Sequence, residues 1–201
     1  MTGMSDAPIR FYFSLRSPYV WLATEEIVRA GIAVAPIPVV GFAAGTVFSD
    51  PVANPPRLAY VIEDVARIAA RHDLALMPPV DTQDWAAVHN AVEFAKQQGR
   101  GMAFTQIAAR LRWTQSLDLA DPEVIAGAAE AAGIDPDGAV AAMGDTSIRA
   151  RMIEAYTPRI EADQVFGVPF FAFDADGRTH RYWGQDRIAM MLEDARAMGV
   201  V

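Results

Sequence analysis

A serine at the start of a helix is the first group in this chain that could take part in chemistry. Ser17 lies between an apolar, aromatic run at residues 9–13 and Pro18, which stands where a first helical turn tolerates a residue without an N–H group. The free backbone N–H groups of such a turn favour negative charge beside the Ser17 hydroxyl. From position alone, however, a simple N-cap serine is the commoner explanation. Since no base lies next to it in sequence, we expect Ser17 to donate a hydrogen bond and not to act as a nucleophile.

Three further places hold candidate site residues, and each also has a purely structural interpretation. Val168 and Pro169 begin an apolar run, in which the proline could simply initiate a strand. Gln185 and Asp186 open the last predicted helix, where Asp186 could serve only as a favourable first-turn acid. Trp183 lies beside them and could either shield a site or fill the edge of the core.

Asn54 and the histidines complete the set of candidates. Asn54 precedes two prolines and could simply begin a turn, as Asn-Pro commonly does. His72, His89 and His180 have no metal-ligand spacing, so we expect no metal site. His89 lies one helical turn after Trp85, from where it could reach a cleft.

The composition excludes several classes of function. The chain has no cysteine, which rules out disulfide exchange on its own residues and thiolate metal sites. Its formal net charge is −8 and Lys96 is its only lysine, so we expect neither nucleic acid nor an anionic membrane surface as a partner. The first ten residues lack the layout of a signal peptide, and no apolar run reaches the roughly 18 residues of a membrane span. We therefore expect a cytoplasmic globular protein.

The hydrophobic periodicity predicts which elements position these residues. A buried strand is predicted at 9–13, a helix from Pro18 to about Ala30, and an irregular or edge strand at 33–40. A hairpin over 168–183 and a helix from Gly184 close the chain. Between Ala44 and about Asp145 there is no convincing strand. Helical patterns are predicted at 58–73, 85–98, 102–115, 122–133, 136–144 and 147–156, with Thr157-Pro158 kinking or restarting the last of them.

Four segments together resemble one known family. They are FYFSLRSPYVWLA at 11–23, NPPRLAYVIEDVARIAARHDLAL at 54–76, VFGVPFF at 165–171 and YWGQDRI at 182–188. In this order they are similar to the kappa-class glutathione transferases and 2-hydroxychromene-2-carboxylate isomerases, which are related to DsbA-type oxidoreductases. The WGQDR run resembles the isomerase branch more. The resemblance implies an α/β, DsbA-like architecture: a thioredoxin-like domain at 1–43 and 146–201, with an inserted all-helical domain at 44–145.

The resemblance also implies a glutathione site. Ser17 stands where thioredoxin-like redox proteins carry their reactive cysteine, and it would stabilise the glutathione thiolate by a hydrogen bond. Pro169 would be cis, and the backbone of Val168 would pair with the cysteinyl part of glutathione. Gln185 and Asp186 would hold the γ-glutamyl end.

Asn54 matches a family asparagine that faces cofactor and substrate. Many members carry a lysine shortly afterwards, whereas here the nearest cation is Arg57. Arginine is not equivalent to lysine at a specific contact, which leaves open whether this region binds a substrate anion. Arg16, directly before Ser17, could favour a thiolate or simply point to solvent.

The leading hypothesis is a glutathione-dependent isomerase acting on a small aromatic or enone-type carboxylic substrate by reversible addition of the thiolate. A kappa-like glutathione transferase is the nearest alternative, and a non-catalytic, cysteine-free binding module is the alternative from another class. By resemblance we also expect a homodimer.

Overall fold

The computed structural model describes residues 8–47 and 51–201, and four of its strands form one sheet in the order β2-β1-β3-β4. β1 (Ile9–Phe13) pairs in parallel with β2 (Val34–Pro38) and antiparallel with β3 (Phe170–Ala175). β3 continues into β4 (Arg178–Trp183) as an antiparallel hairpin. β2 lies at the sheet edge, as its prolines predicted, because a proline has no N–H to donate to a neighbouring strand.

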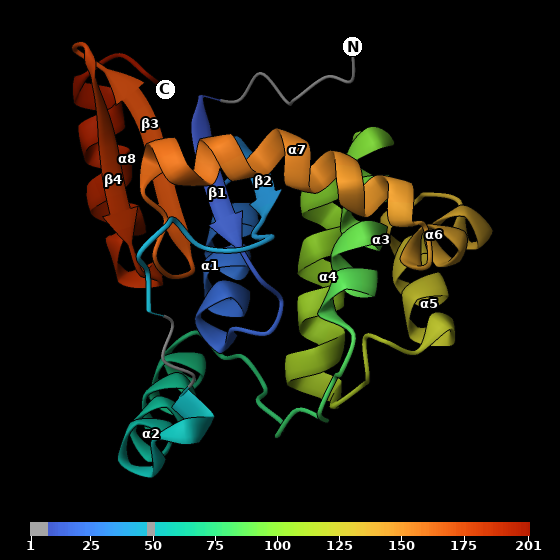
Figure 1. Ribbon diagram of the computed structural model, residues 1–201. Helices are drawn as coiled ribbons and strands as arrows, with labels where there is room; N and C mark the ends of the chain where they lie inside the picture. The colour runs from blue at the N-terminus through green and yellow to red at the C-terminus, as the bar shows by residue number, and fades with distance from the viewer. Residues whose placement is uncertain (1–7, 48–50) are drawn as a thin grey trace.

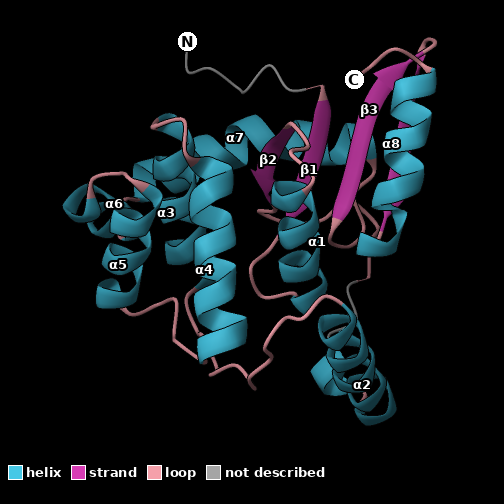
Figure 2. Ribbon diagram, turned by 180° about the vertical axis from the view of Figure 1, so that it is seen from behind, coloured by secondary structure: helices cyan, strands magenta, loops and turns pink. Residues whose placement is uncertain are grey.

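Helices occupy both faces of this sheet. α7 (Thr146–Asp163) crosses one face, while α1 (Pro18–Arg29) and α8 (Ile188–Ala197) cover the other (Figures 1 and 2). The side chains of β1 point alternately to these two faces. Ile9, Phe11 and Phe13 belong to the core shared with α1 and α8, whereas Tyr12 packs with residues of α7. The predicted thioredoxin-like α/β fold is confirmed.

The described chain between β2 and β3 contains helices and loops but no strand, as predicted. α3, α4, α5 and α6 gather beside the sheet, whereas α2 stands apart from them below α1 (Figure 1). The domain boundaries near residues 43 and 146 stay a prediction. The helices of this segment are η1 (Pro51–Ala53), α2 (Pro55–Arg71), α3 (Trp85–Gln97), α4 (Gly101–Gln115), α5 (Pro122–Ala132), α6 (Pro136–Met143) and α7 (Thr146–Asp163).

Two helix predictions need correction. α7 continues through Pro158, so Thr157 caps no new helix. Pro158 is exposed, which lets water satisfy the carbonyl that the proline leaves unpaired, while buried Tyr156 and Ile160 hold the helix on both sides. The last helix begins later than predicted, because a 3-10 turn, η2 (Gln185–Arg187), precedes α8.

The chain's single lysine joins α3 to α7. Lys96 forms an ion pair of 3.0 Å with Glu93 and donates a hydrogen bond to the Tyr156 hydroxyl. That hydroxyl donates to Glu93 Oε2 at 2.6 Å. Burial lowers the pKa of Lys96 and raises that of Tyr156. These mutual contacts satisfy the polar groups of an otherwise apolar seam.

Candidate functional site

Several of the predicted site residues meet where β1 ends. The register pairs Tyr12 with Phe170, which puts the preceding residue, Pro169, beside the end of β1. The Gly184 N–H donates to the Pro169 carbonyl at 3.0 Å, so the end of β4 reaches the same place. η2 in turn contacts α1. The fold thus brings Ser17, the 168–169 loop and η2 to one end of the sheet.

Ser17 is the N-cap residue of α1, but its side chain does not cap the helix. Its backbone carbonyl accepts from the N–H groups of Val20 and Trp21, at 3.1 and 3.3 Å. Its side chain makes no cap hydrogen bond, and the residue is half-buried. A serine retained only as an N-cap would normally use its hydroxyl oxygen for this bond. The Ser17 hydroxyl is therefore available to a partner near the positive end of α1.

The Val168–Pro169 peptide bond is cis, as the resemblance implied. A Cβ on Gly167, the residue before Val168, would lie 2.8 Å from Trp183 Nε1, so any other residue there would displace the indole. The indole therefore lies against the backbone of the loop. Trp183 is 53% exposed and contacts Phe166, with ring centroids 5.0 Å apart. Trp183 is thus an exposed wall of the cis-proline loop and not a core side chain.

Gln185 and Asp186 lie in η2, where Gln185 is half-buried and Asp186 is exposed. Gly184 before them has φ +111°, and a Cβ there would lie 2.5 Å from Asp186 Oδ1. Asp186 Oδ2 accepts from Arg187 Nη1 at 2.8 Å. Such an exposed ion pair contributes little to stability, so the Asp186 carboxylate can exchange Arg187 for another cation at small cost.

Asn54 caps α2, with its Oδ1 accepting from the Arg57 N–H at 3.3 Å. α2 is joined to the first turn of α1 by the Tyr19 hydroxyl, which donates to Asp64 Oδ2 at 3.0 Å. Burial and the Asp64 carboxylate raise the pKa of Tyr19, and the positive charge of Arg57 opposes them. The start of α2 therefore lies near the start of α1, but Asn54 itself is exposed and engaged in capping.

Sequence reasoning missed Arg112, which the fold brings close to Arg16. Trp113, the next residue of α4, stacks on Trp21 of α1 with centroids 6.4 Å apart. Arg112 is 5% exposed, and burial is the main cause of its lowered pKa, to which the charge of Arg16 also contributes. A signal was present: Arg112 follows Phe104 and Ala108 at four-residue spacing, so a charge stands on an apolar helix face.

The histidines add nothing to the candidate site. His89 is 4% exposed and packs edge-on against Phe13, so it lies in the core. The described residues contain no group of acidic or histidine side chains that could hold a metal ion. Nor does any described helix have the length and apolarity to cross a membrane.

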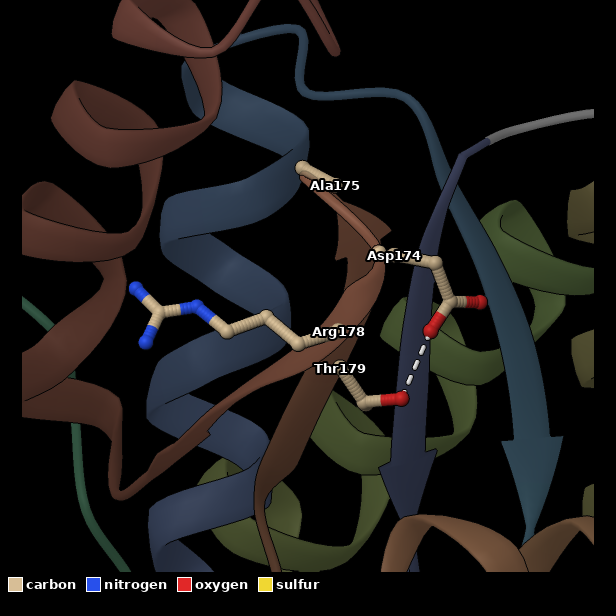
Figure 3. A pocket seen from close by; sticks show the side chains of 5 residues that line it. Asp174, Ala175, Arg178 and Thr179 are labelled. Carbon is tan, nitrogen blue, oxygen red and sulfur yellow. Dashed lines mark hydrogen bonds between the residues drawn. The ribbon is translucent and has the colours of Figure 1, made fainter.

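A surface pocket on the β3–β4 hairpin lies at the opposite end of the sheet from Pro169. Asp174, Ala175, Arg178 and Thr179 line it, and Thr179 donates to Asp174 at 2.7 Å (Figure 3). The Asp174 carboxylate also accepts from Arg10, at 2.8 Å. Its acceptors are thus used by the protein itself, and this pocket is separate from the candidate site.

A thioredoxin-like sheet, a cis-proline loop and a serine at the start of α1 define a thioredoxin-fold protein that lacks the redox thiols. The chain belongs to the DSBA-like thioredoxin domain family, whose model matches residues 8–195. It is 26% identical over 190 residues to the 2-hydroxychromene-2-carboxylate isomerase of Sphingobium xenophagum, covering 90% of this chain and 93% of that protein.

Solved structures show the same fold. A 2-hydroxychromene-2-carboxylate isomerase matches with a TM-score of 0.76 at 23% identity, over 94% of each chain. A probable DsbA oxidoreductase from Streptomyces coelicolor matches with a TM-score of 0.72 at 19% identity, over 94% of this chain and 89% of that one. The distant homology to the isomerase bears out the family resemblance read from the sequence.

Proposed function

We propose that this protein is a glutathione-dependent isomerase of the 2-hydroxychromene-2-carboxylate isomerase type. The observation that carries the proposal is the Ser17 hydroxyl, which lies at the positive end of α1 without capping it. The isomerase homologue, which aligns over nine-tenths of the chain, supports the same reaction class.

When bound, glutathione supplies the nucleophilic sulfur that the chain lacks, for reversible addition to an activated double bond. The part of Ser17 is to donate a hydrogen bond to a thiolate, which lowers the pKa of the thiol together with the first-turn N–H groups of α1. Such preorganised donors cost no reorganisation at the moment of reaction.

The other candidate residues would hold and orient the tripeptide. The Val168 backbone, beside the cis bond, would pair with its cysteinyl part. Gln185 and Asp186 would bind the γ-glutamyl end, where the Asp186 carboxylate would exchange Arg187 for the ligand's ammonium. Asn54 and Trp183 would flank the bound molecule from α2 and from the end of β4. The residues present therefore fit the chemistry of glutathione.

Two further parts of the proposal concern the setting. We expect a cytoplasmic protein, because glutathione keeps thiols reduced in that compartment. We also expect a homodimer. The exposed apolar side chains of Tyr60 and Ile62 on α2 are available for a contact between copies.

The first test is Ser17→Ala. We expect the variant to fold normally and to lose about 100-fold or more in turnover, because it removes one donor to the developing charge. The ultraviolet absorbance of the thiolate, followed against pH, should show that the wild-type protein lowers the pKa of bound glutathione and that the variant does so less.

Ser14→Ala is the matched control, since Ser14 lies three residues earlier and its hydroxyl accepts, among the described residues, from the Arg16 N–H at 3.4 Å. Unchanged turnover in Ser17→Ala would remove Ser17 from the mechanism. Loss of glutathione in proportion to product would indicate a transferase, and no calorimetric binding at millimolar glutathione would indicate a binding module.

A further inference from the structure

Arg112 carries a buried positive charge that has no direct ion pair with a carboxylate among the described residues. Its Nη1 donates to the Val80 carbonyl at 2.9 Å and to Thr82 Oγ1 at 3.0 Å, and its Nε is buried without a hydrogen-bond partner. No ion pair forms at Arg112 within residues 8–47 and 51–201, although Asp81 and Asp118 act on it at longer range. Buried charges in proteins are ordinarily paired, so this one requires an explanation.

The Arg112 guanidinium lies over two indole rings. Its central carbon lies 4.7 Å from the ring centroid of Trp85 and 5.1 Å from that of Trp113. Cation–π attraction to these rings offsets part of the cost of burial. The pKa of Arg112 is lowered to about 10, chiefly by burial, so the side chain stays charged at neutral pH.

The position of Arg112 connects it to the candidate site. Trp113 stacks on Trp21, which lies one helical turn after Ser17. The charge of Arg16, the residue before Ser17, is close enough to lower the pKa of Arg112. Arg112 thus lies on the side of α1 that faces α4, within electrostatic range of Arg16, and the half-buried Trp85 lies against its guanidinium.

We propose that Arg112 and Trp85 form the subsite that binds the carboxylate and the adjoining flat, conjugated system of the second substrate. The inference rests on the proposed function and names the residues that would select its substrate. An Nε–H without an acceptor in a desolvated position is a strong donor to a carboxylate oxygen, and an uncharged ligand cannot neutralise the charge. An indole face suits a planar ligand.

A carboxylate could also come from the glycine end of glutathione. We assign the subsite to the conjugated acid, because two aromatic rings lie next to the guanidinium and a glycine carboxylate offers nothing to stack on them.

The test uses cinnamate and cinnamamide, which have nearly the same shape and differ in charge. In calorimetric titrations of the wild-type protein, with and without glutathione, cinnamate should bind at least about tenfold more tightly than cinnamamide. Arg112→Gln should abolish this preference, and Arg112→Lys should retain part of it.

One control tests whether loss of any positive charge has the same effect. Arg29→Gln removes the same charge from an exposed position at the far end of α1 and should leave the preference unchanged. Equal affinity for both probes in the wild type, no binding of cinnamate at millimolar concentration, or a preference that survives in Arg112→Gln would each overturn the proposal.

If Arg112→Gln does not fold, the variant Trp85→Phe tests the subsite instead. Cinnamate should change the tryptophan fluorescence of the wild-type protein, and much less that of Trp85→Phe. An equal change in both would contradict the subsite. Arg112→Gln could instead bind glutathione more weakly than the wild type does, while both bind the glycine ester of glutathione equally. Arg112 would then bind the glycine carboxylate of the tripeptide, and the proposal would be overturned.

The two proposals can fail separately. A cinnamate preference in a protein that does not bind glutathione would overturn the proposed function and leave the subsite. Binding of glutathione without a preference for cinnamate would overturn the subsite and leave the proposed function.

Discussion

His89 is a buried histidine that the fold keeps uncharged. It lies edge-on to Phe13, with ring centroids 6.4 Å apart, and its Nε2 has no partner within the described residues. Burial, assisted by the positive charge of Arg149, lowers its pKa from 6.5 to about 4. Between these two values the unfolded chain takes up a proton at His89 that the folded chain does not. Stability contributed by neutral His89 is therefore complete near neutral pH and is lost as the pH falls from about 6.5 towards 4.

This linkage predicts that His89 accounts for about 2 kcal/mol of lost stability between pH 7 and pH 5. In urea denaturation at these two pH values, His89→Leu should lose less stability on acidification than the wild type by about this amount. His72→Gln, which changes an exposed histidine at the end of α2, should behave as the wild type does. The same acid sensitivity in His89→Leu and in the wild type would contradict the prediction.

At the scale of elements, α2 buries a smaller share of its residues than any other described α-helix. Of its 17 residues only Val65 and Ala69 are buried. The figures show it apart from the other helices of the insert (Figures 1 and 2). Its hydrogen bond to α1 runs from Tyr19 to Asp64. With so little burial, α2 should open locally at a lower free energy than the sheet does.

Tyr19→Phe should make this local opening easier by about 1 kcal/mol, the usual contribution of one such hydrogen bond. Amide hydrogen exchange should then quicken roughly fivefold in α2 and stay unchanged in β1 and β3. Tyr182→Phe is the matched control, because it removes a tyrosine–aspartate bond of 2.7 Å between β4 and α8. Unchanged exchange in α2, or equal acceleration throughout the chain, would show that the bond does not hold this helix.

For the molecule as a whole, local signals were enough to predict most elements. The apolar run at Ile9–Phe13 became the central strand β1, and Asp121 with Pro122 marked the start of α5. The continuous α7 could not be predicted locally, because packing of Met152 and Ile160 against the sheet outweighs the helix-breaking tendency of Pro158.

The site was less predictable than the fold, because it depends on which elements meet. Ser17 and Pro169 could be proposed through a resemblance that covers both, although their roles stay predictions. Arg112 could not, since its significance comes from the stacking of Trp113 on Trp21, which are far apart in sequence. Long-range contacts of this kind are only weakly indicated by the local sequence. Here the one indication is a charged residue on an apolar helix face.

The buried ammonium between α3 and α7 has a practical consequence. Since Lys96 is the only lysine and its ammonium contacts Glu93 and Tyr156, no lysine side chain of this sequence stands free for reagents that acylate amines. Any label that reaches Lys96 reports that the seam between these two helices has separated.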